Sequence, residues 1–222
     1  MIELRNVTKA YELGGEKILA LNNVNLIIDQ GDFVAVMGPS GSGKSTLANL
    51  IGGLDTPTVG QVLFDNEDIG KFNDKKLSNY RNQKIGFIFQ TFNLQPGLTA
   101  LENVTIPMIF SGIPSNERKK RALTCLDAVG LADRVKHLPS QLSGGQRQRV
   151  CIARAIVNSP KVIIADEPTG NLDSKKGSEI MDILDALNKM AHISLLVITH
   201  DESVASRARR RILIKDGVLE EK

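Results

Sequence analysis

The sequence predicts an α/β fold, in which a mostly parallel sheet is covered by helices on both faces. Three observations point to this class. Residues 33–37 form a short apolar run that ends at a glycine, as a buried central strand does. A stretch of helical character follows between residues 103 and 158. After it, short apolar runs of strand character return at 162–165 and 194–198.

The elements of the first part of the chain, up to about residue 90, have the pattern of short strands around one helix. Alternating residues predict strands at 2–7 and 19–28, and the run 61–64 follows a glycine. The helical middle, with apolar residues at helical spacing between 117 and 129, interrupts the strand pattern like an insertion. We therefore expect one domain over 1–222, with a core and β-subdomain at 1–90 and 161–222 and a helical subdomain at 91–160.

The composition is that of a globular protein, with 41% hydrophobic and 24% charged residues. A net charge of +3 and an aromatic content of 4% offer little to a nucleic acid, so no nucleic-acid partner is expected. The basic run at 118–121 either binds phosphate or lipid headgroups or forms a solvated helix face. The solvated face is the simpler interpretation.

No apolar run approaches the roughly 20 residues that cross a bilayer. The first residues also lack the charged region followed by an apolar stretch that marks a secretory signal, so we expect a cytoplasmic protein. Cys125 and Cys151 are far apart and outside any C-x-x-C spacing. They are expected to be buried free thiols rather than a disulfide or a metal site.

The loop after residue 37 matches the phosphate-loop pattern G-x-x-x-x-G-K-S/T at every fixed position, between an apolar strand and a helix. Glycines let consecutive backbone N–H groups converge on phosphate oxygens, and the helix N-terminus adds partial positive charge. Lys44 would reach the β- and γ-phosphates, and the hydroxyl oxygen of Ser45 would bind Mg²⁺. A glycine-rich turn that matches by chance does not explain both flanking elements. The expected nucleotide-binding residues are Gly38, Pro39, Ser40, Gly41, Ser42, Gly43, Lys44, Ser45 and Thr46.

Two neighbouring carboxylates follow the apolar run 162–165, namely Asp166 and Glu167. Adjacent residues leave a strand end in different directions, so the two groups can have different roles. Asp166 would hold Mg²⁺ through water, and Glu167 would orient and polarise the attacking water. Such a pair alone is usually an exposed strand end, but in one chain with the phosphate loop it indicates a nucleotide-hydrolysing site.

A second glycine-containing loop, Leu142-Ser143-Gly144-Gly145-Gln146, reproduces the LSGGQ signature of the ABC ATPases. The resemblance covers essentially the whole chain. Physically, this segment is a second phosphate-binding loop at a helix N-terminus, although one nucleotide does not need two such loops from one chain. The resemblance implies a head-to-tail dimer around two Mg-ATP, in which Ser143, Gly144, Gly145 and Gln146 cap the ATP of the other subunit. The alternative is a glycine-containing helix cap.

Other positions resemble the family residue by residue. Gln90 resembles the Q-loop glutamine, which contacts Mg²⁺ and the attacking water. Residues 170–173 resemble the D-loop, which crosses to the partner subunit. His200 resembles the switch histidine at the γ-phosphate, and Tyr11 the aromatic that stacks on adenine; without the resemblance both would be taken for structural residues. The implied catalytic residues are Lys44, Gln90, Glu167 and His200, and the implied Mg²⁺ ligands are Ser45, Gln90 and Asp166.

The resemblance also implies the architecture: a RecA-like P-loop NTPase core with an antiparallel β-subdomain and an inserted helical subdomain. Only about a hundred residues separate the two glycine loops, unlike in the DNA-repair members with long coiled coils. Residues 51–60, 86–96 and 98–104 are similar to ATPases of the lipoprotein-releasing and macrolide-efflux type.

The implied function is an ATPase coupled to transport, lipoprotein release or mechanical transmission. Its implied partners are a second copy of itself, integral-membrane permease subunits and a periplasmic or extracytoplasmic adaptor. It would work on the inner face of the cell membrane, held there by the permease. A soluble regulatory ATPase that transports nothing is the other hypothesis, and the catalytic motifs do not separate the two.

Overall fold

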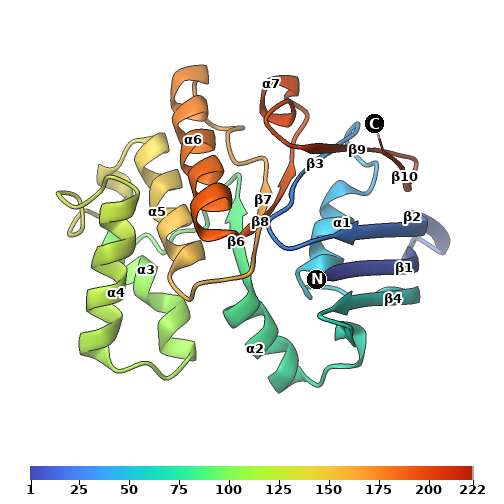
Figure 1. Ribbon diagram of the computed structural model, residues 1–222, viewed down its shortest axis with the longest axis horizontal. Helices are drawn as coiled ribbons and strands as arrows, with labels where there is room; N and C mark the ends of the chain where they lie inside the picture. Colours follow the sequence, from blue (N-terminus) through green and yellow to red (C-terminus); the bar gives the residue numbers. More distant parts are fainter. Residues whose placement is uncertain (222) are drawn as a thin grey trace. The chain divides into compact units, whose positions relative to one another are not determined.

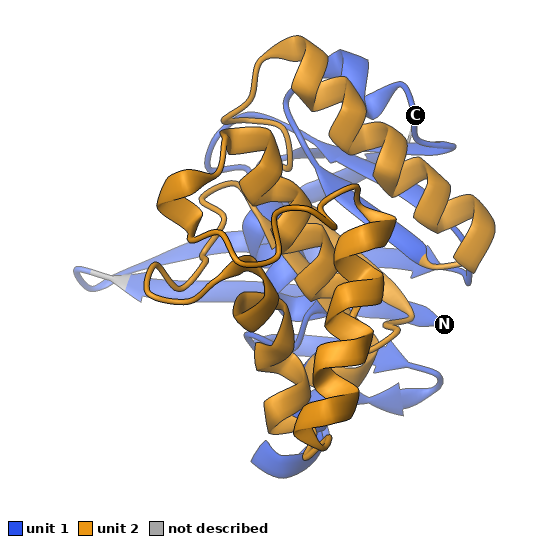
Figure 2. Cartoon of the chain, turned by 90° about the vertical axis from the view of Figure 1, so that its left-hand side faces the viewer, with its two compact units in different colours: residues 1–81, 194–222 blue, residues 82–193 orange. Residues whose placement is uncertain are grey.

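The computed structural model describes residues 1–221, which form two compact units (Figure 2). Unit 1 consists of Met1–Arg81 and Ser194–Lys222, and unit 2 of Asn82–Ile193. Unit 2 therefore combines helices with strands that the sequence analysis assigned to the core. The boundaries expected from the sequence, with 91–160 as a helical subdomain, stay a prediction.

Unit 1 contains an antiparallel sheet with the strand order β2-β1-β4-β5. The first strand pairs on both sides, because Ile2 lies opposite Ile28 of one neighbour and Phe64 of the other. All three side chains are buried, so the sheet has an apolar inner face. The strands are β1 (Ile2–Leu13), β2 (Glu16–Ile28), β4 (Val59–Phe64) and β5 (Glu67–Asp68).

Unit 1 also contains parallel strands, with β3 (Phe33–Met37) between β8 (Ser194–Ile198) and β9 (Arg210–Lys215). The strand β10 (Val218–Glu221) pairs with β9 in the antiparallel direction. Phe33 to Val36 and all of β8 are buried, as expected for strands covered on both faces. The predicted α/β class, with parallel and antiparallel strands and helices, is confirmed (Figure 1).

The helix α1 (Lys44–Ile51) contacts both β2 and β8, so it lies between the two sheets of unit 1. The short elements η1 (Ile69–Lys71) and α7 (Glu202–Ala205) lie in connections. The helix α2 (Asp74–Lys84) was not expected, since the sequence analysis placed one helix in this region. Its buried residue is Tyr80, so it has no apolar stripe that a sequence pattern would reveal.

Unit 2 is built around α5 (Gly144–Ile156), which contacts α3 (Ala100–Phe110), α4 (Ser115–Ala128) and α6 (Ser174–Ala191). This helix also contacts β6 (Ile85–Phe89), which pairs in parallel with β7 (Val162–Asp166). The connection η2 (Pro139–Gln141) precedes α5. Across residues 1–221, no helix is both long enough and apolar enough to span a bilayer.

Candidate functional site

The phosphate loop connects β3 to α1. It contains two glycines that no other residue could replace without displacing the backbone of a neighbouring strand. Gly38 and Gly43 have φ angles of 152° and 107°, in the region that favours glycine. A Cβ would lie 2.2 Å from the backbone oxygen of Ile214 at Gly38, and 2.2 Å from that of Ala20 at Gly43. The loop is therefore packed against β9 on one side and β2 on the other, and its backbone has a defined shape.

The start of α1 is open to an anion. Its N-cap is Gly43, so no side chain caps the first amides. The ammonium of Lys44 donates to the carbonyl oxygens of Gly38 (2.8 Å) and Pro39 (2.7 Å), which folds this side chain back over the loop. Ser42 is buried, and its Oγ has no hydrogen-bond partner among the described residues. Uncapped amides, a lysine and a buried hydroxyl are a donor set that fits phosphate oxygens.

Tyr11 lies beside the first turn of α1. Its hydroxyl donates to Oδ2 of Asp55 at 2.8 Å, and Lys9 donates to Oδ1 of the same carboxylate at 2.6 Å. Burial raises the pKa of Tyr11, as does the bond to Asp55, whereas a hydrogen bond with Thr46 lowers it. The sequence predicted roles for Tyr11 and Thr46 but not for Lys9 and Asp55. Asp55 is 44 positions from Tyr11 and 46 from Lys9 along the chain, and no local pattern links residues so far apart.

His200 lies at the same edge of the parallel strands as the phosphate loop. It follows β8, which runs parallel to β3, and Val36 is the register partner of Ile198. The next backbone amide, that of Thr199, donates to the oxygen of Val36 at 3.1 Å. Parallel strands present their carboxyl ends at one edge, so unit 1 brings His200 and the phosphate loop to the same edge.

Unit 2 brings the predicted carboxylates and the predicted glutamine together. Asp166 is the register partner of Phe89 on the parallel strands β7 and β6. Gln90 and Glu167 therefore leave neighbouring strands side by side. Glu167 has a φ of 47°, which for a non-glycine residue costs roughly 1–2 kcal/mol. Such a conformation, held at the end of a buried strand, fixes the direction in which this carboxylate leaves the sheet.

Residues 170–173 lie against Gln90 in the same chain. A Cβ at Gly170 would be 2.7 Å from Nε2 of Gln90. The side-chain amide of Asn171 donates to the backbone oxygen of Gln90 at 2.8 Å. Asp173 then caps α6 by accepting from the amide of Lys176 at 3.0 Å. The segment expected to reach a partner subunit is thus also part of the support of Gln90.

The signature loop is the N-terminus of α5, as expected. Ser143 is the N-cap, and it forms a capping box with Gln146: Oγ of Ser143 accepts from the amide of Gln146 at 3.3 Å, and Oε1 of Gln146 accepts from the amide of Ser143 at 2.9 Å. A Cβ at Gly144 would be 3.1 Å from Leu172, and one at Gly145 would be 3.3 Å from Lys176. The glycines therefore also permit close packing against the 170–176 segment, a role that the sequence analysis missed.

The expected Mg²⁺ ligands are oxygen donors of three kinds: the hydroxyl of Ser45, the carboxylate of Asp166 and the amide oxygen of Gln90. Hard oxygen ligands of this kind suit Mg²⁺, which keeps waters and phosphate oxygens in the rest of its octahedral shell. Among the described residues no group of three or more His, Cys, Asp or Glu side chains could hold a metal alone. This donor set fits a metal that arrives with a nucleotide.

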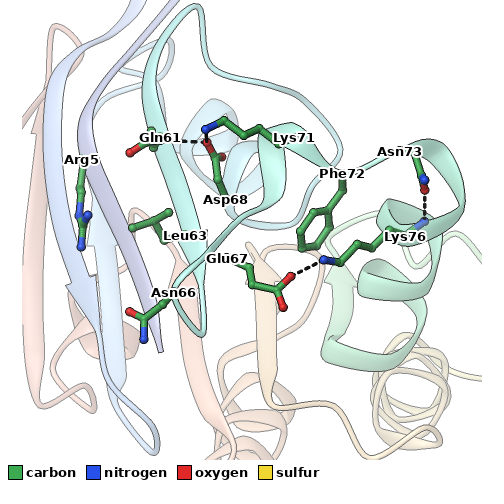
Figure 3. Close-up of a pocket in the computed structure, with 10 residues that line it drawn as sticks. All are labelled: Arg5, Gln61, Leu63, Asn66, Glu67, Asp68, Lys71, Phe72, Asn73 and Lys76. Atoms are coloured by element: carbon green, nitrogen blue, oxygen red, sulfur yellow. Dashed lines mark hydrogen bonds and ion pairs between the residues drawn. The ribbon is translucent and has the colours of Figure 1, made fainter.

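A cavity of about 600 Å³ lies elsewhere in unit 1, beside the antiparallel sheet (Figure 3). Four of its charged side chains are paired with each other, Lys76 with Glu67 and Lys71 with Asp68 at 3.7 Å, and Arg5 pairs with Glu3. The ammonium of Lys76 also lies 4.1 Å from the ring centroid of Phe72. No predicted site residue lines this cavity, and we assign it no role in nucleotide binding.

Comparison with known proteins identifies relatives along the whole chain. The family model described as ABC transporter matches residues 21–170. An uncharacterized ABC transporter ATP-binding protein of Methanocaldococcus jannaschii is 54% identical, with 99% of this chain and 95% of that protein covered. Its cassette has been solved as a dimer, and as a post-hydrolysis dimer bound to ADP and Pi; each structure matches with a TM-score of 0.92 at 52% identity, over 100% of this chain and 98% of that one.

Two relatives have more specific names. The lipoprotein-releasing system ATP-binding protein LolD of Syntrophus aciditrophicus is 46% identical, over 98% of this chain and 97% of that protein. The macrolide export ATP-binding/permease protein MacB of Brucella melitensis is 49% identical, over 98% of this chain and 33% of that protein. In the second case an ATP-binding part and a permease share one polypeptide.

Proposed function

This chain belongs to the ABC transporter family, as an ATP-binding cassette that hydrolyses ATP, and we propose that it does so between two copies of itself to drive membrane permease subunits of the lipoprotein-releasing or macrolide-efflux type. The observation that carries the nucleotide assignment is the open start of α1, where Gly43 leaves the first amides without a side-chain cap. The post-hydrolysis dimer of the Methanocaldococcus relative supports the pairing of two copies.

Residues of unit 1 bind the nucleotide in this proposal. The amides of the phosphate loop and of the start of α1 bind the phosphates. Lys44 exchanges its two loop carbonyls, at 2.8 and 2.7 Å, for β- and γ-phosphate oxygens, so an existing pair of hydrogen bonds is replaced by charge-assisted ones. Tyr11 stacks on adenine, and its phenol is fixed for this by Asp55. His200 contacts the γ-phosphate.

Residues of unit 2 act on the water. Glu167 orients and polarises the attacking water, and Gln90 contacts it beside Glu167. Ser45, Gln90 and Asp166 would hold Mg²⁺, which neutralises charge on the phosphates when bound. Phosphoryl transfer depends mainly on positioning and electrostatics, and the strained, fixed Glu167 provides positioning.

Ser143, Gly144, Gly145 and Gln146 complete the site of the other copy in this proposal. They form the N-terminus of a 13-residue helix, whose partial positive charge suits a γ-phosphate. The dimeric structures of the Methanocaldococcus relative support the pairing of two copies that this sharing of a site requires.

The partners beyond the second copy are an integral-membrane permease, which holds the cassette on the inner face of the cell membrane, and an extracytoplasmic adaptor. The name of MacB supports the permease, and the adaptor is proposed from the family resemblance alone. Affinity purification of the tagged chain from solubilised membranes tests this. Recovery of a permease with the chain is expected, whereas recovery of soluble partners alone would favour a regulatory ATPase.

The proposed chemistry is tested with Glu167→Gln. We expect this variant to bind ATP but to hydrolyse it at least about a hundred-fold more slowly, since a general base is worth 10²–10⁴-fold. It should therefore accumulate as a dimer during size-exclusion chromatography with ATP. A variant that stays monomeric at saturating ATP, or that retains near-normal turnover, would contradict the role of Glu167.

A further inference from the structure

The loop that follows Gln90 has a backbone conformation that needs support. Phe92 and Asn93 have φ angles of 63° and 49°, so two consecutive non-glycine residues occupy the left-handed region. This region is sterically disfavoured for L-residues, more strongly for phenylalanine than for asparagine. The loop therefore keeps this shape because other groups hold it.

Three side chains of α5 hold the loop at this place. The guanidinium of Arg154 donates to both carbonyls, to Phe92 at 2.9 Å and to Asn93 at 2.6 Å. The thiol of Cys151 donates to the oxygen of Phe92 at 3.1 Å, and burial raises the pKa of this thiol to about 12, so it remains a donor. The guanidinium carbon of Arg147 lies 4.9 Å from the ring centroid of Phe92. These contacts attach the loop to α5.

The contacts of Arg154 differ in kind from those at the two ends of the loop. At one end Asn171 donates to the oxygen of Gln90 at 2.8 Å, and at the other Asn103 donates to the oxygen of Leu98 at 2.9 Å. These are bonds from neutral amides, whereas Arg154 makes two charge-assisted bonds to adjacent carbonyls. Among these three side chains, Arg154 is therefore the one whose bonds to the loop are charge-assisted.

The same helix also contacts the backbone beside Glu167. The buried side-chain amide of Gln148 donates to the oxygen of Pro168 at 2.8 Å. Since α5 begins at Gly144, one rigid helix joins the signature loop to the backbone next to both Gln90 and Glu167.

We propose that Arg154 is a positioning residue for ATP hydrolysis, which acts by holding the carbonyls of Phe92 and Asn93 and so sets the position of Gln90 relative to α5. The inference rests on the role proposed above for Gln90. It assigns to Arg154 a function beyond the stability of unit 2, and Arg154 performs that function through Gln90.

A double-mutant cycle on ATP turnover tests this. The variants are Gln90→Ala, Arg154→Gln and the two combined, each measured for kcat and KM. Arg154→Gln alone should lower kcat by about ten-fold or more, because small misplacements of a site residue are costly. Its KM for ATP should change little, since the phosphate loop is intact. In the Gln90→Ala background the same change should alter kcat by less than about two-fold, because residues acting through one another are not additive.

Arg149→Gln is the matched control. Arg149 lies on the same helix and also makes two guanidinium bonds, to the oxygen of Val129 at 3.0 Å and to Glu179 at 2.8 Å, but neither is on the loop. Its effect on kcat should be the same with and without Gln90. Arg154→Lys, which keeps the charge, should recover part of the lost kcat. If thermal unfolding shows that Arg154→Gln is not folded, Arg154→Lys and Cys151→Ala replace it in the cycle.

Two outcomes overturn the inference, and they differ. If Gln90→Ala alone leaves kcat unchanged, the role proposed for Gln90 is wrong and the inference is wrong with it. If Gln90→Ala lowers kcat but the Arg154 change lowers it by an equal factor in both backgrounds, the role of Gln90 stands and Arg154 is only structural.

Discussion

Gly170 lies so close to Gln90 that a Cβ on the glycine would be 2.7 Å from Nε2 of the glutamine. The nearest atom is the end of a flexible side chain, so Gln90 can move aside at small cost. We therefore expect the unfolding free energy of Gly170→Ala to lie within about 1 kcal/mol of the wild-type value. Its kcat should be about three- to ten-fold lower. Chemical denaturation and steady-state turnover separate the two effects.

Gly177→Ala is the control for that change. Gly177 lies in α6, and a Cβ there would meet Thr169 at 3.4 Å, an ordinary contact. Alanine in a helix is favoured over glycine by about 1 kcal/mol, so this variant should be as stable as the wild type or more so. Its kcat should not fall. An equal loss of kcat in both variants would show that Gln90 is not the target.

The phosphate loop offers a second matched pair of glycines. Gly43→Ala should destabilise the chain by about 3 kcal/mol and abolish ATP binding, since the added Cβ would lie 2.2 Å from the oxygen of Ala20 at a φ of 107°. Gly41→Ala adds a Cβ with no other atom within 4 Å, at a φ of 77°. We therefore expect it to destabilise the chain by only about 1–2 kcal/mol, the cost of the backbone conformation. Urea unfolding measures both. Equal costs would show that the contact with β2 does not shape the loop.

Ser143→Arg tests whether the signature loop serves the other copy. The isolated monomer should bind ATP with nearly normal affinity by calorimetry, while dimer formation and hydrolysis are lost because the arginine fills the space of the γ-phosphate. Lys44→Ala should instead fail at binding. Mixing the two variants creates one site from intact halves. If the folded Ser143→Arg monomer binds ATP as poorly as Lys44→Ala, the loop serves its own nucleotide and the head-to-tail dimer is wrong.

The carboxylate that anchors Tyr11 predicts a pH dependence of stability. Burial raises the pKa of Asp55, but hydrogen bonds from Lys9 and Tyr11 outweigh it and lower the pKa below its ordinary 3.8. A carboxyl group whose pKa is lowered by folding stabilises the folded state at pH values above its ordinary pKa. This stabilisation is lost as the pH falls through the lowered pKa of the folded state. The stability advantage of the wild type over Asp55→Asn should therefore shrink as the pH falls through the ordinary value of 3.8 and below it. A constant difference would contradict the pairing.

Local patterns predicted those features whose determinants are adjacent in sequence. The apolar run at 33–37 is β3, and the loop that follows it is held in shape by its own glycines. Likewise, Ser143 and Gln146 are three residues apart, and the capping box they form is a local structure.

Features that depend on contacts between distant residues were missed. Asp55 approaches Tyr11 across 44 positions, and Arg154 approaches Phe92 across 62. No periodicity encodes such pairs. The helix α2 was missed for another reason, since its 11 residues are polar on nearly every side and Tyr80 alone among its described residues is buried. Its position is set by Tyr80, whose hydroxyl donates to the oxygen of Ile51 at 2.7 Å.

The capping box also determines which part of the Ser143 hydroxyl can face a ligand. A hydroxyl has one proton and two lone pairs, and in this chain one lone pair accepts from the amide of Gln146. The proton is not used by this bond, so one oxygen can cap the helix and donate to a phosphate at the same time. Threonine shares both properties. Aspartate is an equally good cap but an acceptor without a proton, so it would separate helix capping from donation at this position.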